Sequence, residues 1–107
     1  MDTMARFEQA VAVLKELGSP QVAVVLGSGL SDVLPLKEKK SLSFQEIPGF
    51  PVPTVAGHSG RVEVGKVGNR EVLVQRGRIH FYEGYELSEV VIPVRTYALL
   101  GVKTLVI

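Results

Sequence analysis

The spacing of apolar residues near the amino terminus predicts a helix. Over residues 4–17, apolar side chains recur every three or four positions, at Phe7, Val11, Leu14 and Leu17. This spacing places them on one face of an α-helix, so the segment is an amphipathic helix that packs against other elements. Asp2 or Thr3 can cap its start, and Gly18 ends it.

Two patterns further along the chain predict extended strands. Residues 22–26 form a continuous apolar run that leads into a glycine loop, as a buried strand does before a tight turn. Residues 61–67 alternate valines with charged side chains, and a second apolar run at 71–75 follows the turn Gly68-Asn69. These two runs predict a β-hairpin with Arg61, Glu63 and Lys66 on its polar side.

The segment between these strands is polar and then rich in proline. Residues 35–41 predict a solvated connection that includes Lys37, Lys39 and Lys40. Residues 42–47 predict a short strand, and three prolines within residues 48–53 exclude regular structure there.

The last twenty residues predict one helix and one strand. A helix is expected over residues 88–100, with Pro93 beginning or kinking it and Gly101 ending it. Residues 102–107 predict another buried strand, and the chain stops there without a turn or a polar tail. The alternation of strands and helices predicts an α/β sheet, and we expect this chain to be the truncated first part of a longer protein.

Composition limits the possible functions. The chain has 107 residues, of which 46% are hydrophobic and 21% charged, so at most one domain is expected, and residues 1–107 are expected to be the amino-terminal part of that domain. Its formal net charge of +1 argues against a nucleic-acid or membrane-surface partner held by charge alone. With no cysteine and two histidines, a structural metal is not expected. The charged amino terminus lacks the apolar region of a signal peptide, which predicts a cytoplasmic protein.

The loop Gly27-Ser28-Gly29-Leu30 is a candidate phosphate cradle. Small residues after a buried strand expose backbone N–H groups and the Ser28 hydroxyl to an anion. The loop is not a dinucleotide fingerprint, because Asp32 stands where a Gly or Ala is required, and it lacks the lysine of a P-loop. The alternative is a tight turn that uses glycine for its positive φ.

Further candidate ligands lie at two later positions. His58 stands in Gly57-His58-Ser59-Gly60, where a backbone can approach a ligand closely; the alternative is an exposed turn histidine. Arg78 and His80 follow the second hairpin strand, and a guanidinium with a nearby imidazole suits phosphate oxygens; the alternative is a solvated strand end. Arg76 is interpreted as an ion-paired or solvated residue.

Aromatic and acidic residues follow these candidates directly. Tyr82 and Tyr85 supply an aromatic face that suits a sugar or a base, and Glu83 can orient His80. Packing of a loop edge is the alternative explanation for all three residues.

Five segments, taken in order, resemble the purine nucleoside phosphorylases of the trimeric type. They are VVLGSGL, EIPGFP, GHSGR, RGRIHFYEGY and PVRTYALLGVKTLVI, and the resemblance runs from about residue 22 to residue 107. It implies a mixed central β-sheet flanked by helices, here truncated after its first strands, and a homotrimer when the chain is full length. It also implies phosphorolysis of purine nucleosides to a free base and a pentose 1-phosphate. No cofactor is implied, since inorganic phosphate is a substrate.

The resemblance also implies roles for individual residues. The phosphate would be held by four of them: Ser28, His58, Arg78 and His80. Tyr82 would contact the ribose, and Glu83 would orient His80, which makes His80 and Glu83 the expected catalytic pair.

Two departures from the family and the missing remainder set the limits of this interpretation. The family commonly has Gln at the position of Arg76 and an aromatic residue at that of Ile79. Its purine-recognition residues would lie beyond Ile107, so we expect the 107-residue chain to be inactive alone. A methylthioadenosine phosphorylase-like enzyme, a noncatalytic anion-binding module and a hydrolytic nucleosidase remain as alternatives.

Overall fold

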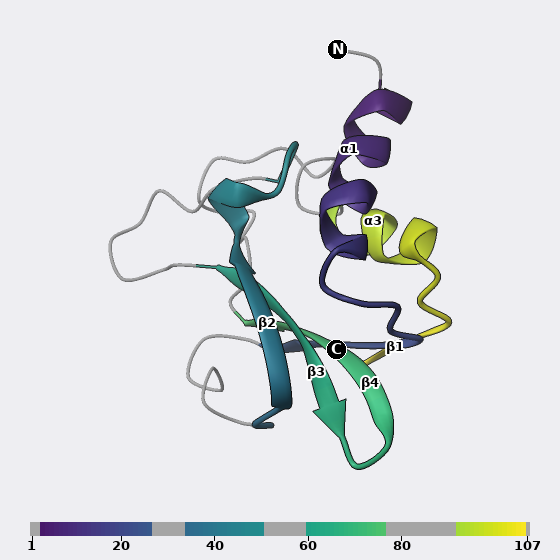
Figure 1. Ribbon diagram of the computed structural model, residues 1–107. Helices are drawn as coiled ribbons and strands as arrows, with labels where there is room; N and C mark the ends of the chain where they lie inside the picture. Colours follow the sequence, from purple (N-terminus) through teal and green to yellow (C-terminus); the bar gives the residue numbers. More distant parts are fainter. Residues whose placement is uncertain (1–2, 27–33, 51–59, 77–91, 107) are drawn as a thin grey trace.

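The computed structural model describes residues 3–26, 34–50, 60–76 and 92–106, and they form a single sheet with two helices (Figure 1). In chain order the elements are α1 (Thr3–Lys15), β1 (Val22–Leu26), β2 (Lys37–Ser43), a 3-10 turn (Phe44–Glu46), β3 (Arg61–Val67), β4 (Arg70–Arg76), α3 (Ile92–Leu100) and β5 (Thr104–Val106). The predicted first helix, first strand and β-hairpin are therefore confirmed.

The five strands are arranged in the order β2-β3-β4-β1-β5. β1 runs parallel to both β4 and β5, whereas β3 is antiparallel to β2 and β4. The sheet is mixed, and the α/β fold class expected from the sequence is confirmed.

Both helices cover the same face of the sheet, where they lie side by side (Figure 1). The main core contains α1 residues such as Leu14 and strand residues such as Val62 and Leu73, all of which are fully buried. Aromatic rings complete this layer: Phe44 and Phe50 meet edge to face with centroids 5.4 Å apart, and Phe50 meets Tyr97 at 6.2 Å. Burial of this apolar surface provides the main driving force for the fold.

A smaller apolar cluster lies on the other face of the sheet. Its buried members are Leu36, Val72 and Val74, and Leu34 packs against them. Because side chains alternate along a strand, Val72 and Val74 share this second face with Arg76. The charged residues described below therefore border an apolar patch.

Two predictions about the middle of the chain are wrong. Lys37–Ser43 is the edge strand β2, paired antiparallel with β3, although most of residues 35–41 were expected to form a solvated connection. Its residues 37–41 are exposed, so their polarity reflects an edge strand, where lysines discourage pairing with another chain. The strand predicted over 42–47 extends only to Ser43, because the Glu46 carboxylate accepts hydrogen bonds from the Ser43 N–H and Oγ and closes a 3-10 turn.

The last two predicted elements are partly confirmed. Within the predicted range 88–100 the structure describes α3 from Ile92, and Pro93 is the second residue of this helix. Gly101 follows at φ +118°, a conformation that favours glycine and ends the helix. β5 is a strand as predicted but is not buried, since Val106 is 49% exposed at the edge of the described sheet.

Candidate functional site

Three segments that carry predicted ligands join the sheet at the same edge, which is the one where β1 and β4 end and β3 begins. Leu26, the last residue of β1, pairs in parallel with Arg76, the last residue of β4. Arg61, the first residue of β3, pairs antiparallel with the same Arg76. The chain therefore leaves β1 toward Ser28 and leaves β4 toward Arg78 at the edge where it arrives at β3 from His58. In open α/β sheets, ligands bind outside the carboxyl ends of the parallel strands.

The predicted site residues themselves lie outside the described residues. They are Ser28, His58, Arg78, His80, Tyr82 and Glu83, which fall within 27–33, 51–59 and 77–91. Their assigned roles remain predictions, and what the structure does describe is the scaffold on which their segments are mounted.

A buried carboxylate lies at this edge of the sheet, surrounded by cations. The side chain of Glu63 is 2% exposed and accepts a hydrogen bond from Arg76 Nε on Oε1 at 2.7 Å. Its Oε2 accepts another from Arg61 Nε at 2.8 Å, and Lys39 Nζ lies 3.6 Å from the same oxygen. Three cations around one carboxylate leave a surplus of positive charge at the edge from which the candidate phosphate ligands extend.

The carboxyl group of Glu63 stays ionised in this environment. Burial by itself raises its pKa, because a charged group loses hydration there. The hydrogen bonds from Arg61 and Arg76 and the charges of Arg76 and Lys39 outweigh burial, and the pKa is lowered overall. Glu63 is therefore an anion at neutral pH.

Arg76 connects this carboxylate to the segment that follows the glycine loop. One of its terminal nitrogens, Nη2, donates a hydrogen bond to the backbone carbonyl of Leu34 at 2.7 Å. Leu34 has φ +64°, a conformation that is uncommon outside glycine. Arg76 is only 4% exposed, which confirms its interpretation as an ion-paired residue and excludes the solvated alternative.

The burial of Glu63 was not foreseen from the alternating pattern of its strand. The register of the hairpin contains the signal that could have revealed it. The turn at Gly68-Asn69 places Arg61 directly opposite Arg76. Like charges directly opposite each other are unfavourable, so a carboxylate is expected within reach of both. Glu63 lies two positions from Arg61 on the same face of the strand.

A hydrogen bond on the helix-covered face secures the same strand end. Tyr97 of α3 donates its hydroxyl proton to Gln75 Oε1 at 2.5 Å, and both side chains are buried. Burial raises the pKa of Tyr97 well above its ordinary value, so the phenol stays protonated and donates. The end of β4 is thus held on one face by Tyr97 and on the other by Glu63.

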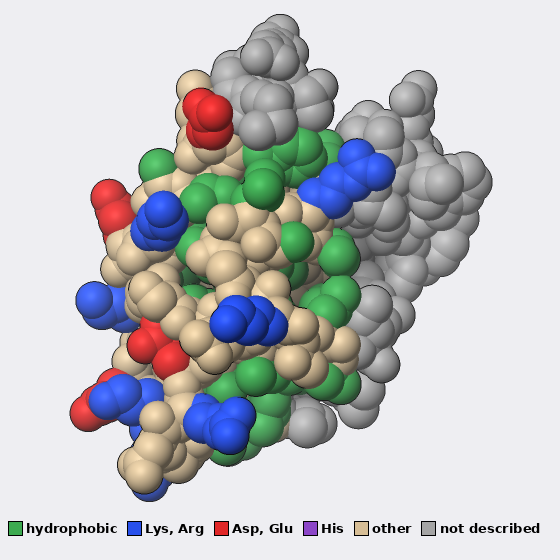
Figure 2. Space-filling view, turned by 90° about the vertical axis from the view of Figure 1, so that its right-hand side faces the viewer, with side chains coloured by type: hydrophobic (Ala, Val, Ile, Leu, Met, Phe, Trp, Pro, Cys, Tyr) green, Lys and Arg blue, Asp and Glu red, His purple; other side chains and the backbone are tan. Residues whose placement is uncertain are grey.

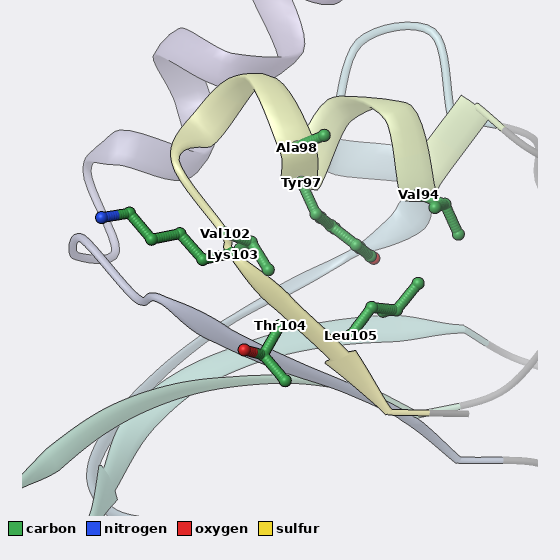
Figure 3. A pocket seen from close by; sticks show the side chains of 7 residues that line it. All are labelled: Val94, Tyr97, Ala98, Val102, Lys103, Thr104 and Leu105. Atoms are coloured by element: carbon green, nitrogen blue, oxygen red, sulfur yellow. The ribbon is translucent and has the colours of Figure 1, made fainter.

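Two cavities lie away from this edge. One, of about 200 Å³, lies between α3 and β5, and Val94, Tyr97 and Leu105 project into its apolar interior (Figure 3). The other, of about 350 Å³, is polar and lies where β1 and β4 begin, beside Gln21 and Arg70. Neither is lined by residues next to the predicted ligand segments.

The face of the molecule drawn in Figure 2 carries charges of both signs. In this view Lys and Arg side chains lie among Asp and Glu side chains, without a broad region of one sign among the described residues.

The described residues contain no cluster of three or more His, Cys, Asp or Glu that could hold a metal ion. None of the described helices is long and apolar enough to cross a membrane. Among the described residues, the excess of positive charge next to the candidate site is that of the Glu63 cluster.

Comparison with known proteins identifies the family. The profile described as the phosphorylase superfamily matches residues 21–107. The chain belongs to this superfamily. It is 51% identical over 89 residues to a purine nucleoside phosphorylase of Mus musculus, covering 82% of this chain and 31% of that protein. It is 39% identical over 105 residues to purine nucleoside phosphorylase 1 of Bacillus subtilis, covering 95% of this chain and 39% of that protein.

Solved structures support the same relationship. Isoform 2 of the purine nucleoside phosphorylase of Schistosoma mansoni, solved in complex with cytosine and ribose-1-phosphate, matches with a TM-score of 0.85 and 36% identity. The match covers 94% of this chain and 36% of that one. A purine nucleoside phosphorylase from the same organism in complex with inosine matches with a TM-score of 0.80 and 36% identity, covering 95% of this chain and 36% of that one. The family and nucleoside phosphorylase fold expected from the sequence motifs are confirmed, and the chain spans about a third of the length of its relatives.

Proposed function

We propose that the protein containing these 107 residues catalyses the reversible phosphorolysis of purine nucleosides. The products are a free purine base and a pentose 1-phosphate, and the proposed role is purine salvage in the cytoplasm by a homotrimer that needs no cofactor. The observation that carries the proposal is that β1 and β4 end, and β3 begins, at one edge of the sheet, so that the three segments with the predicted ligands join the sheet there, beside a surplus of positive charge. The similarity to purine nucleoside phosphorylases supports it further.

We assign the phosphate site to residues that lie two or three positions along the chain from the described strand ends. Ser28 lies two residues beyond β1, Arg78 lies two residues beyond β4, and His58 lies three residues before β3. Two or three residues reach at most about 7–11 Å, and neighbouring strands are about 4.8 Å apart. Side chains extending from these three points can therefore contact one phosphate ion. His80 completes the proposed phosphate site.

The nucleoside is assigned to the residues that come next. In the proposed reaction a phosphate oxygen forms a bond to the anomeric carbon as the bond from that carbon to the purine nitrogen breaks. The bonding electrons leave with the purine, and the sugar passes through a cation-like transition state. Tyr82 contacts the ribose, while Glu83 orients His80 against the phosphate. Such a transition state is stabilised by an anionic nucleophile held in place beneath it.

An assay of the intact protein tests this proposal. Incubation with inosine and inorganic phosphate should release hypoxanthine and ribose 1-phosphate, and no cleavage should occur without phosphate. Cleavage without phosphate would indicate a hydrolytic nucleosidase. Preference for methylthioadenosine over inosine and guanosine would favour the methylthioadenosine phosphorylase alternative.

A second assay tests whether the 107 residues are sufficient for activity without the rest of the protein. The 107-residue chain alone should show no sustained turnover of inosine, because it spans about a third of its relatives. Phosphate binding without turnover by the intact protein would favour a noncatalytic anion-binding module. The Arg78→Ala variant should lose far more phosphate affinity than any variant at an exposed lysine such as Lys40.

A further inference from the structure

The ion pair between Glu63 and Arg76 joins all three segments of the proposed site. Arg76 is the residue from which the chain continues toward Arg78, and its guanidinium also bonds the carbonyl of Leu34, the first described residue after 27–33. Arg61, the second residue held by Glu63, is where β3 begins after the segment that contains His58. A single buried carboxylate thus lies at the junction of three separate stretches of chain.

The chemistry of this junction suits positioning rather than direct contact with substrate. Arg76 is 4% exposed, its Nε is bonded to Glu63, and its Nη2 is bonded to a backbone carbonyl. Its side chain is therefore committed to neighbouring protein groups. The planar guanidinium donates in two fixed directions at once, so it sets the distance between the end of β4 and the segment at Leu34.

We propose that Glu63 is a positioning residue, which holds Arg76 and Arg61 so that the segments bearing Ser28, His58 and Arg78 are mounted in the geometry that binds phosphate. This inference rests on the proposed function for its ligand. The ion pair fixes the scaffold of the phosphate site without touching the phosphate.

Positioning and plain electrostatics predict opposite effects of one substitution. Glu63→Gln removes a negative charge near the phosphate site and keeps the shape of the side chain. If charge alone mattered, the variant would bind phosphate more tightly. If Glu63 positions the segments, the variant should raise the phosphate KM roughly ten- to a hundred-fold, because small displacements of ligand groups have effects of that size.

The experiment compares variants of the intact protein in phosphorolysis of inosine. Glu63→Gln is expected to raise the phosphate KM while changing the inosine KM less. The double variant Glu63→Gln/Arg76→Gln replaces the ions with a neutral pair and should recover part of the loss. The matched control is Glu38→Gln, which removes an exposed ion pair with Lys66 from the same sheet and should leave all constants unchanged. An unchanged or lowered phosphate KM in folded Glu63→Gln would overturn the inference.

A measurement without substrate separates this inference from the proposed function. Hydrogen–deuterium exchange of the amides at 27–34 and 77–80 should be faster in Glu63→Gln than in Glu38→Gln or in the unaltered protein. Equal exchange in all three proteins would overturn the positioning role whatever the kinetics show. If the unaltered protein neither cleaves inosine nor binds phosphate, the proposed function is wrong, and the exchange result alone decides whether Glu63 holds these segments.

Discussion

The two ends of the β3–β4 hairpin are built from similar charges but in different surroundings. At the open end, the side chains of Arg76 and Glu63 are 4% and 2% exposed, and Arg76 Nε lies 2.7 Å from Glu63 Oε1. Near the turn end, Lys66 and Glu38 are 51% and 73% exposed and lie 3.1 Å apart. Water screens the second pair and not the first, so only the first can fix the position of neighbouring chain.

This contrast shows where the fold uses charge for precision. A buried ion pair seldom adds more stability than a well-packed apolar pair of the same size, because both ions lose hydration. What it adds is a fixed relative position of the two partners, because each directional hydrogen bond breaks when either partner moves. The proposed phosphate ligands extend from the open end of the hairpin. At that end, the exact position of the chain matters more for binding than the stability that the ion pair adds.

The largest effect is expected from breaking the buried pair on one side. Arg76→Ala leaves the Glu63 carboxylate buried without one of its cations and should destabilise the protein by about 3–5 kcal/mol. Urea denaturation of the intact protein measures the change. The double variant Glu63→Gln/Arg76→Gln should be less destabilised than Arg76→Ala, and the reverse order would contradict this account of the pair.

A second comparison uses glycines at the two ends of the hairpin. A Cβ added at Gly60 would lie 2.4 Å from Cε2 of the buried Phe44 ring, so Gly60→Ala should cost about 1–3 kcal/mol through overpacking. Gly68 has φ +63° and open space around it, so Gly68→Ala should cost only about 1 kcal/mol through backbone strain.

Thermal and urea denaturation of the two variants measure both costs. The variant Phe44→Leu, combined with Gly60→Ala, provides the control, because a smaller side chain at 44 leaves room for the added methyl group. If the double variant were no more stable than the sum of its two single changes predicts, the clash with Phe44 would not be the cause.

A smaller effect is expected from acid. The pKa of Glu63 is lowered in the folded state, so its contribution to stability is fully present above the unfolded value of about 4.3. That contribution is lost as the pH falls through the lower folded value, because the unfolded chain binds the proton more readily. Denaturation midpoints measured between about pH 6 and pH 3 should therefore fall more steeply for the unaltered protein than for Glu63→Gln. Parallel curves would show that Glu63 is not the titrating group.

Much of the fold could be predicted from local sequence, but the scaffold of the site could not. The helix at residues 3–15, the strand at 22–26 and the hairpin around Gly68 follow from periodicity and turn chemistry. Most of β2 was not predicted, because its first five residues are exposed charged or hydroxyl side chains, and such a segment becomes a strand only through pairing with β3. Such pairing is a property of distant segments.

The candidate site shows the same division. The candidate ligand residues could be proposed one at a time from small residues and charged groups, and the order of the motifs along the chain resembles that of the family. Their meeting at one edge depends on β1 lying between β4 and β5, which no local pattern specifies. The burial of Glu63 also depends on partners from other strands, Arg76 and Lys39. Alternation along its own strand therefore placed it on a polar side, whereas its side chain is buried.

The smallest effect is expected at the turn end, from Lys66→Gln. The ion pair with Glu38 is exposed on both sides, so its loss should change the free energy of unfolding by less than about 1 kcal/mol. The same variant should leave the phosphate KM unchanged, because Lys66 is near the opposite end of β3 from Arg61. Measured beside Arg76→Ala, this variant separates the effect of a buried, directional ion pair from that of charge as such. A loss of phosphate affinity in Lys66→Gln would mean that the general positive charge of the hairpin, and not the geometry at Glu63, governs binding.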